Sequence, residues 1–98
     1  MIVAQKFILI VYDISNDKRR TKLHDVLLNF GAPVQYSVFE CLLSIDEEEK
    51  MRKAVYRVIR PRVDAVRFYY LCLECLKKTR VTSGPEVLAP QTGAIVVG

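Results

Sequence analysis

The chain has 98 residues, 51% of them hydrophobic, and its 15 Lys and Arg against 11 Asp and Glu give a net charge of +4. This length predicts one domain, and the composition excludes a largely disordered chain. The apolar run from Phe7 to Tyr12 is too short to cross a bilayer and lacks the order of a secretory signal. We therefore expect a cytoplasmic protein with no membrane partner, in a reducing compartment that suits its three cysteines.

The charges are unevenly placed along the chain. Four of the eleven acidic residues form one run, Asp46 to Glu49, so the rest of the chain is more basic than the net charge indicates. A positive surface suits an anionic partner such as nucleic acid. A basic protein without such a partner fits the charge equally well.

The first predicted element is a strand. The run from Phe7 to Tyr12 consists of β-branched, aliphatic and aromatic residues, which is typical of a central strand buried on both faces. The strand ends at Asp13, and the next residues have turn chemistry. Asn16 or Asp17 can cap the helix that follows.

The first predicted helix presents one apolar stripe to the core. Its spacing of i, i+3, i+4 and i+7 is met by Leu23, Val26, Leu27 and Phe30. Gly31 stands where a left-handed C-terminal cap is expected, and Pro33 prevents the helix from continuing.

A second strand region runs from Val34 to Leu43, and Ser37 in its middle predicts a bend, a bulge or two short strands. Ser44 and Glu47 match the capping box of a second helix, which becomes amphipathic and ends at Arg60 and Pro61. A further strand is predicted over 64–73, with one face formed by Val66, Phe68, Tyr70 and Cys72.

This order predicts an α+β fold, a ferredoxin-like β-α-β-β-α-β sandwich with two helices on one face of an antiparallel sheet. The core domain would span residues 1–80. Residues 81–98 would form a tail, in which Val87–Leu88 and 94–97 are candidate edge strands. A spare apolar strand often pairs with another chain, so we expect this tail in a homodimer interface or against another partner.

Asp13 is the first candidate for chemistry because it follows a buried strand. Mg²⁺ takes one or two protein carboxylates and completes its shell with water and phosphate oxygens. One Asp13 per chain, paired with its copy across a two-fold axis, would therefore be sufficient. The alternative is an ordinary aspartate that closes a turn.

The start of the first helix is basic, with Lys18, Arg19, Arg20 and Lys22. Cations in a first turn oppose the helix dipole, and the same cations with the helix N-terminus attract a phosphate. The alternative is a solvated helix face. Ser15 and Asn16 can donate to a phosphate or ligate a metal through water, although such residues more often close a turn.

Other chemistry-bearing residues fit structural roles better. Phe39 offers a stacking surface, but an aromatic residue in a strand usually belongs to the core. Cys72 and Cys75 have C-x-x-C spacing, yet zinc needs four ligands and Cys72 is predicted on a strand. We therefore do not expect a metal or redox function there. His24 is predicted as a partly exposed surface residue.

Two stretches together resemble one known family. Residues 11–20, VYDISNDKRR, and 34–41, VQYSVFEC, are similar to the Cas2 family, the second of the two universal CRISPR adaptation proteins. The resemblance extends from the first strand to the basic segment after Cys75. It rests on a Tyr-Asp at the end of the first strand, a basic helix start and the Ser-Val-Phe-Glu motif.

The resemblance implies a ferredoxin-like homodimer that takes part in spacer acquisition, bridges the Cas1 integrase and holds a DNA duplex. It also implies a Mg²⁺-dependent endonuclease acting on RNA or DNA, with Asp13 as the catalytic, metal-binding residue and Tyr12 beside it. Nucleic-acid contacts carry over onto Arg20, Lys22 and Phe39. Pro33 stands where many members have a basic residue, so that phosphate contact is missing here.

Three functions thus remain open. The first is a magnesium-dependent endonuclease that acts on single-stranded RNA or duplex DNA. The second is a non-catalytic scaffold that holds duplex DNA and bridges the integrase. The third is a regulatory module that binds a metabolite, but three of the four glycines lie in the last fifteen residues, where no ligand loop is predicted.

Overall fold

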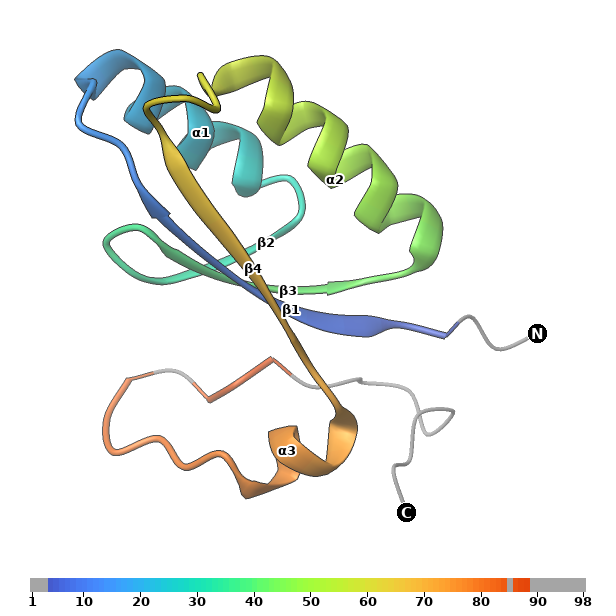
Figure 1. Ribbon diagram of the computed structural model, residues 1–98. Coiled ribbons are helices and arrows are strands. Elements are labelled where there is room, and N and C mark those ends of the chain that lie inside the picture. Colours follow the sequence, from blue (N-terminus) through green and yellow to red (C-terminus); the bar gives the residue numbers. More distant parts are fainter. Residues whose placement is uncertain (1–3, 85, 89–98) are drawn as a thin grey trace.

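The computed structural model describes residues 4–84 and 86–88. Its elements in chain order are β1 (Lys6–Asp13), α1 (Asp17–Leu27), β2 (Gly31–Gln35), β3 (Val38–Leu43), α2 (Ile45–Val58), β4 (Ala65–Leu71) and α3 (Leu73–Lys78). The four strands form one antiparallel sheet in the order β2-β3-β1-β4, and α1 and α2 cover one of its faces (Figure 1). This confirms the predicted β-α-β-β-α-β arrangement. None of the described helices is long and apolar enough to cross a membrane.

The core lies between the sheet and the two long helices. Every second side chain of β1 points to the helices, so Ile8, Ile10 and Tyr12 are buried there. They pack with buried residues from β3, α1 and α2, namely Phe39, Cys41, Leu43, Leu23, Leu27, Met51 and Val55. The predicted stripe of α1 is therefore confirmed at Leu23 and Leu27, and Phe30 packs against the same core.

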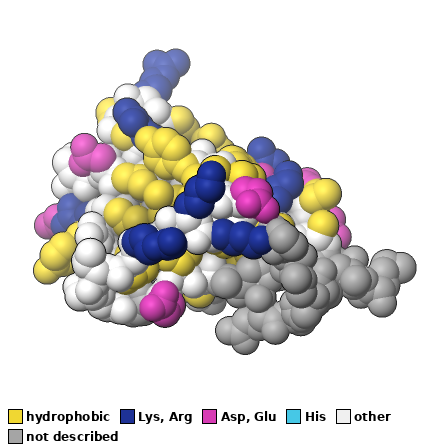
Figure 2. Space-filling view, turned by 90° about the horizontal axis from the view of Figure 1, so that it is seen from below, with side chains coloured by type: hydrophobic (Ala, Val, Ile, Leu, Met, Phe, Trp, Pro, Cys, Tyr) yellow, Lys and Arg dark blue, Asp and Glu magenta, His cyan; other side chains and the backbone are white. Residues whose placement is uncertain are grey.

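Within the described residues no long helix covers the opposite face of the sheet, and we call it the open face. On β1 it carries Phe7, Leu9, Val11 and Asp13, paired with Leu71, Tyr69, Arg67 and Ala65 of β4. Leu9 and Val11 are only half-buried, so the prediction that β1 is buried on both faces is wrong for this part of the strand. α3 and the segment after it lie on this side, where Figure 2 shows hydrophobic side chains beside several Lys and Arg.

The bend predicted at Ser37 is a tight hairpin turn. β2 and β3 are joined by Tyr36 and Ser37, and Ser37 has a φ of 60°, in the left-handed region. The backbone N–H of Tyr12 donates to the Ser37 carbonyl at 3.0 Å. The hairpin tip is therefore fastened to the end of β1.

The prediction that Gly31 forms a left-handed helix cap is wrong, because Gly31 begins β2 and has no positive φ. A Cβ on Gly31 would stand 2.2 Å from the carbonyl oxygen of Glu40 and 2.6 Å from Sγ of Cys41. Glycine is needed at this position because two strands approach closely. The helix itself ends with a turn at residues 28–30.

Both predicted helix starts are confirmed. The Asn16 side chain accepts from Arg19 N at the start of α1, and Ser44 and Glu47 form the reciprocal capping box of α2. A buried carboxylate on α2, Glu48, accepts hydrogen bonds from the Tyr70 hydroxyl and from Lys6 Nζ, the latter at 3.4 Å. This cluster joins α2 to the central strand β1 and to the edge strand β4.

The end of the described chain differs from the prediction in two ways. β4 ends at Leu71, and Cys72 is the N-cap of α3 instead of a strand residue. Val87–Leu88 is not a strand, although Leu88 N–H donates to Glu40 Oε1 at 3.2 Å and returns the segment to the sheet. The second candidate strand, 94–97, lies outside the described residues.

Candidate functional site

Asp13 ends β1 on the open face, with an exposed side chain. Nothing in the described ranges 4–84 and 86–88 forms a hydrogen bond or an ion pair with its carboxylate. It pairs across the sheet with Ala65, a side chain too small to cover it. The carboxylate is therefore available to a cation or to water, as a binding or catalytic group must be.

Arg67 is a neighbour of Asp13 that the sequence reasoning missed. It lies opposite Val11 on β4, on the same face as Asp13 and one diagonal step away. Its side chain is exposed and donates to the Tyr69 hydroxyl at 3.1 Å. The signal was present in the sequence, since Arg67 alternates with the apolar residues of the predicted strand.

Tyr12 and Asp13 lie on opposite faces of the sheet, because successive strand residues alternate. Tyr12 is 4% exposed, and its ring stacks on Phe39 with 6.4 Å between centroids. Burial raises the pKa of the Tyr12 phenol, while the positive charge of Arg20 lowers it by less. The phenol is therefore protonated at neutral pH, and its ring does not share the space in front of Asp13.

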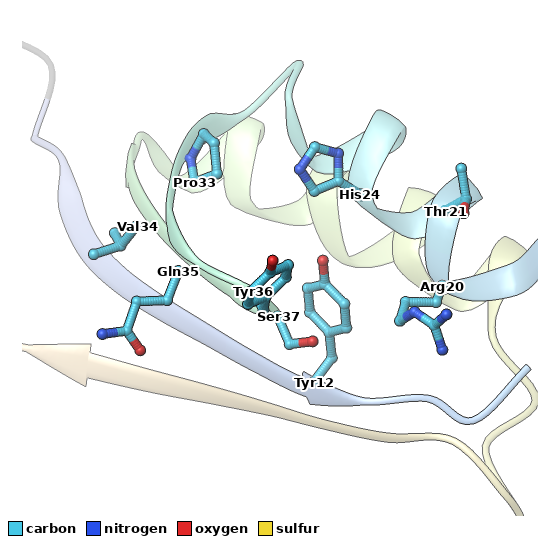
Figure 3. Close-up of a pocket in the computed structure, with 9 residues that line it drawn as sticks. All are labelled: Tyr12, Arg20, Thr21, His24, Pro33, Val34, Gln35, Tyr36 and Ser37. Atoms are coloured by element: carbon cyan, nitrogen blue, oxygen red, sulfur yellow. The ribbon is translucent and has the colours of Figure 1, made fainter. Parts of the chain in front are cut away.

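A pocket of about 980 Å³ lies on the Tyr12 side of the sheet, between α1 and the β2–β3 hairpin. It is lined by Tyr12, Arg20, Thr21, His24 and residues 33–37. In Figure 3 the Tyr12 ring stands between Arg20 of α1 and Tyr36 of the hairpin. Tyr36 is 98% exposed, so the pocket has one aromatic wall that is open to solvent.

The four basic residues of α1 fall into two groups. Arg19 donates to the buried carboxylate of Asp64, from Nε at 2.7 Å and from Nη2 at 3.0 Å. Arg20 donates to the Ile14 carbonyl at 2.9 Å and pairs with Asp17. Both charges are thus engaged within the chain. The Arg19–Asp64 pair was not predicted, because 45 residues separate its members and no local pattern announces it.

Lys18 and Lys22 form the second group. They are one helical turn apart, both exposed, and have no ion-pair partner within the described part of the chain. A shallow groove that they line also contains Asp17, Thr21 and Asp25. Lys18 and Lys22 are therefore the α1 cations that remain available to a phosphate.

Of the other residues that the sequence singled out, some are exposed and others are engaged or buried within the chain. Ser15 is exposed before α1, whereas the Asn16 side chain is occupied by its bond to Arg19 N at 2.9 Å. The nucleic-acid contact expected of Phe39 is wrong, because its side chain is fully buried between Tyr12 and His24. The core interpretation of Phe39 is confirmed. His24 is half-buried, as predicted, and meets the Phe39 ring edge to face.

The described part of the chain offers a metal ion at Asp13 a single carboxylate. No three His, Cys, Asp or Glu side chains come together among the residues that the structure describes. Mg²⁺ usually takes one or two carboxylate ligands from a protein, and Asp13 can supply one of them. The donor set therefore fits Mg²⁺ when water and phosphate oxygens complete its shell, with or without a second carboxylate.

Comparison with known proteins decides the family. Residues 6–79 match the family model described as CRISPR associated protein Cas2. The chain belongs to the Cas2 family. It is 36% identical over 88 residues to the CRISPR-associated endoribonuclease Cas2 3 of Synechocystis sp., covering 90% of this chain and 96% of the relative. It is also 37% identical over 67 residues to the CRISPR-associated endonuclease Cas2 2 of Thermus thermophilus, covering 68% of this chain and 74% of that one.

Solved structures agree with the Cas2 assignment. A chain in the partial Cas6-RT-Cas1–Cas2 complex superposes with a TM-score of 0.72 at 28% identity, covering 87% of this chain and 99% of the other. The matched family region includes Asp13, all of α1 and Arg67. The candidate site thus lies within the part of the chain that is typical of Cas2 proteins.

Proposed function

We propose that this Cas2 protein acts in CRISPR adaptation as a homodimer that binds nucleic acid and cleaves phosphodiester bonds at Asp13 in a Mg²⁺-dependent reaction. The observation that carries the proposal is the exposed Asp13 carboxylate, which has no partner in the described chain and lies beside Arg67. The names of the two relatives, an endoribonuclease and an endonuclease, support nuclease activity. The Cas1–Cas2 complex among similar structures supports the Cas1 integrase as a partner.

The open face of the sheet supports the homodimer. Leu9 and Val11 are only half-buried in the single chain, and Tyr69 is 42% exposed. A second copy packed on this face would remove apolar surface from water, and a small domain gains stability in this way. Two-fold symmetry would also bring a second Asp13 to the site, supplying the carboxylate that one chain lacks.

The residues have separate roles in this proposal. The two Asp13 carboxylates would hold Mg²⁺, which when bound supplies positive charge at the phosphate and lowers the pKa of a bound water. Lys18 and Lys22 would attract the phosphates of the strand, and Arg67 would add a positive charge on the Asp13 face. Ser15 can donate a hydrogen bond to a phosphate. Tyr12 would act as a positioning residue, since its backbone N–H holds the hairpin tip and its ring packs in the core.

The test is cleavage of labelled single-stranded RNA and of duplex DNA by the purified protein, with Mg²⁺ or with EDTA. Asp13→Asn is compared with Asp46→Asn, which changes an exposed aspartate in the first turn of α2. The proposal expects cleavage that needs Mg²⁺, disappears in Asp13→Asn and persists in Asp46→Asn. Full cleavage by a dimeric Asp13→Asn protein would overturn it.

A non-catalytic scaffold is the second candidate function. It is favoured by the similarity to a chain in a Cas1–Cas2 complex. The surface that carries Lys18, Lys22 and Arg67 would then hold duplex DNA between integrase subunits without cutting it. The cleavage assay separates the two functions, because neither the wild type nor Asp13→Asn would cut if the protein is a scaffold. Both proteins would still bind duplex DNA, with an affinity that falls steeply as salt rises.

A further inference from the structure

Two exposed cysteines meet at the point where the chain leaves the sheet. Cys72 directly follows β4 and is the N-cap of α3, while Cys75 lies three residues later, in the first turn of the same helix. Their sulfur atoms are 3.2 Å apart and joined by a hydrogen bond, and the backbone N–H of Cys75 donates to Cys72 Sγ at 3.4 Å. A disulfide bond is roughly 2.0 Å long, so a small rotation of both side chains would close it.

The two thiols differ in reactivity. The pKa of Cys72 is lowered because the backbone N–H and the thiol of Cys75 both stabilise its thiolate. The same contact raises the pKa of Cys75. Thiolates are the nucleophiles in thiol chemistry, so Cys72 is suited to attack first and Cys75 to react second. Cys41 is different, since it is buried in the core and burial raises its pKa to about 12.

We propose that Cys72 and Cys75 form a thiol–disulfide exchange site that reacts with low-molecular-weight disulfides. The sequence did not predict a redox function here because it placed Cys72 on a strand, whereas Cys72 is the N-cap of α3. A structural zinc site is the other use of such a pair, but it needs four ligands, and no group of three is present in the described ranges. The proposed chemistry does not depend on the nuclease site, because it uses residues at the opposite end of β4 from Asp13.

The reaction has two balanced steps. The Cys72 thiolate attacks one sulfur of the small disulfide, which breaks that S–S bond, forms a mixed disulfide on Cys72 and releases one thiolate that takes a proton from water. Cys75 then loses its thiol proton to water and attacks Cys72 Sγ, which expels the second small thiolate. One small disulfide is reduced to two thiols while the cysteine pair is oxidised.

The location of the pair gives the oxidation a structural effect. α3 has six residues and none of them is buried, so little packing fixes its first turn. A Cys72–Cys75 disulfide would lock this turn to the end of β4. The segment beyond α3 returns to the sheet, where Leu88 N–H donates to Glu40 Oε1. Oxidation would therefore stiffen the connection between the sheet and this returning segment.

The experiment equilibrates the full chain in mixtures of oxidised and reduced glutathione, quenches with acid, alkylates the free thiols and reads the products by mass spectrometry. We expect a reversible loss of two hydrogen atoms that maps to Cys72 and Cys75, with Cys41 still reduced. In Cys75→Ser the reaction should stop at a glutathione adduct on Cys72. In Cys72→Ser the adduct should form more slowly, because Cys75 lacks the lowered pKa.

Two results would overturn the proposal. One is a wild-type protein whose Cys72 and Cys75 are alkylated readily but form no mutual disulfide at any glutathione ratio. The other is Cys72→Ser forming the adduct as fast as Cys75→Ser, which would remove the order of attack. A near-UV or far-UV circular dichroism spectrum of each variant verifies that the fold is retained in either case.

Discussion

The guanidinium of Arg19 donates two hydrogen bonds to the buried carboxylate of Asp64, whose Oδ2 also accepts from Arg60 N at 2.8 Å. This arrangement ties the first turn of α1 to the loop that leads into β4. It satisfies both oxygens of a carboxylate whose side chain is 1% exposed. A cation that charge counting assigns to nucleic acid is therefore part of the fold's own structure.

Asp64→Asn should lower the Tm by more than about 10 °C, because it leaves the Arg19 guanidinium without its charged partner. Arg19→Gln should have a similar effect, and the double variant should cost less than the sum of the two. Thermal melts of the four proteins by circular dichroism measure this. Additive effects would show that the two side chains do not interact in solution.

Tyr70→Phe should lower the free energy of unfolding by about 1–2 kcal/mol at neutral pH, because Glu48 loses a hydroxyl donor. The Tyr70 hydrogen bond is the main cause that holds the pKa of Glu48 below the ordinary value of 4.5, and the Lys6 hydrogen bond and nearby cations add to it. A lowered pKa stabilises the fold above that value, and the stability is lost as pH falls through the folded pKa. The difference between wild type and Tyr70→Phe should therefore shrink below pH 4.5.

Urea denaturation at pH values on both sides of this point measures the effect. Tyr56→Phe is the matched control, since Tyr56 lies on the same helix as Glu48 but is 56% exposed. A Tyr70→Phe difference that stays constant with pH would contradict the assignment to Glu48.

Gly31→Ala should destabilise the protein by about 1–3 kcal/mol, because the added methyl group meets the Glu40 carbonyl oxygen. Gly31→Asn distinguishes this cause from a left-handed backbone. Asparagine tolerates the left-handed region, so it would be the milder change if Gly31 had a positive φ. If the close approach of the Glu40 carbonyl oxygen is the cause, Asn should destabilise the protein at least as much as Ala. The free energies of unfolding from chemical denaturation decide between the two causes.

Ser37→Val should cost about 1–2 kcal/mol, since a β-branched residue is strained at the φ of 60° that the hairpin turn requires. Ser37→Gly should stay within about 1 kcal/mol of wild type, because glycine adopts this conformation freely. Equal stabilities of the two variants would mean that the turn changes its conformation when the side chain is altered.

Lys18→Ala and Lys22→Ala should each weaken duplex binding at all sequences and reduce the slope of log affinity against log salt by roughly 1. The control is Lys53→Ala, a lysine of α2 that pairs with Glu49 at 3.1 Å. Fluorescence anisotropy at several salt concentrations gives the slopes. Unchanged slopes in both α1 variants would exclude this face from the binding surface.

The elements that local chemistry determines were predicted well. The apolar run of β1, the Asn16 and Ser44 caps and the bend at Ser37 depend on residues close in sequence, and all are confirmed. The misses depend on distant partners. Gly31 is constrained by Glu40 across the sheet, and Arg19 is held by Asp64, so neither role can be read from neighbouring residues.

In the candidate site, too, the features set by neighbouring residues could be predicted and those set by distant contacts could not. The position of Asp13 at the end of β1 came from the hydrophobic pattern, and the structure adds that the carboxylate is exposed and unpartnered in the described chain. The placement of Tyr12 and Asp13 on opposite faces of the sheet could also be predicted, because successive residues of a strand alternate between faces. The burial of Phe39 could be expected from the alternation in β3, but its contacts with Tyr12 and His24 need three elements to come together.

In the part of the chain that the structure describes, the strand order gives the sheet two unlike borders. β2 is one border and contains Pro33, which has no N–H to offer, and its pairing with β3 is irregular between Pro33 and Gln35. β4 is the other border, with seven regular residues and no proline. Growth of this sheet by an added strand is therefore directional, with the β4 side able to supply a full row of backbone donors and acceptors and the β2 side unable to do so.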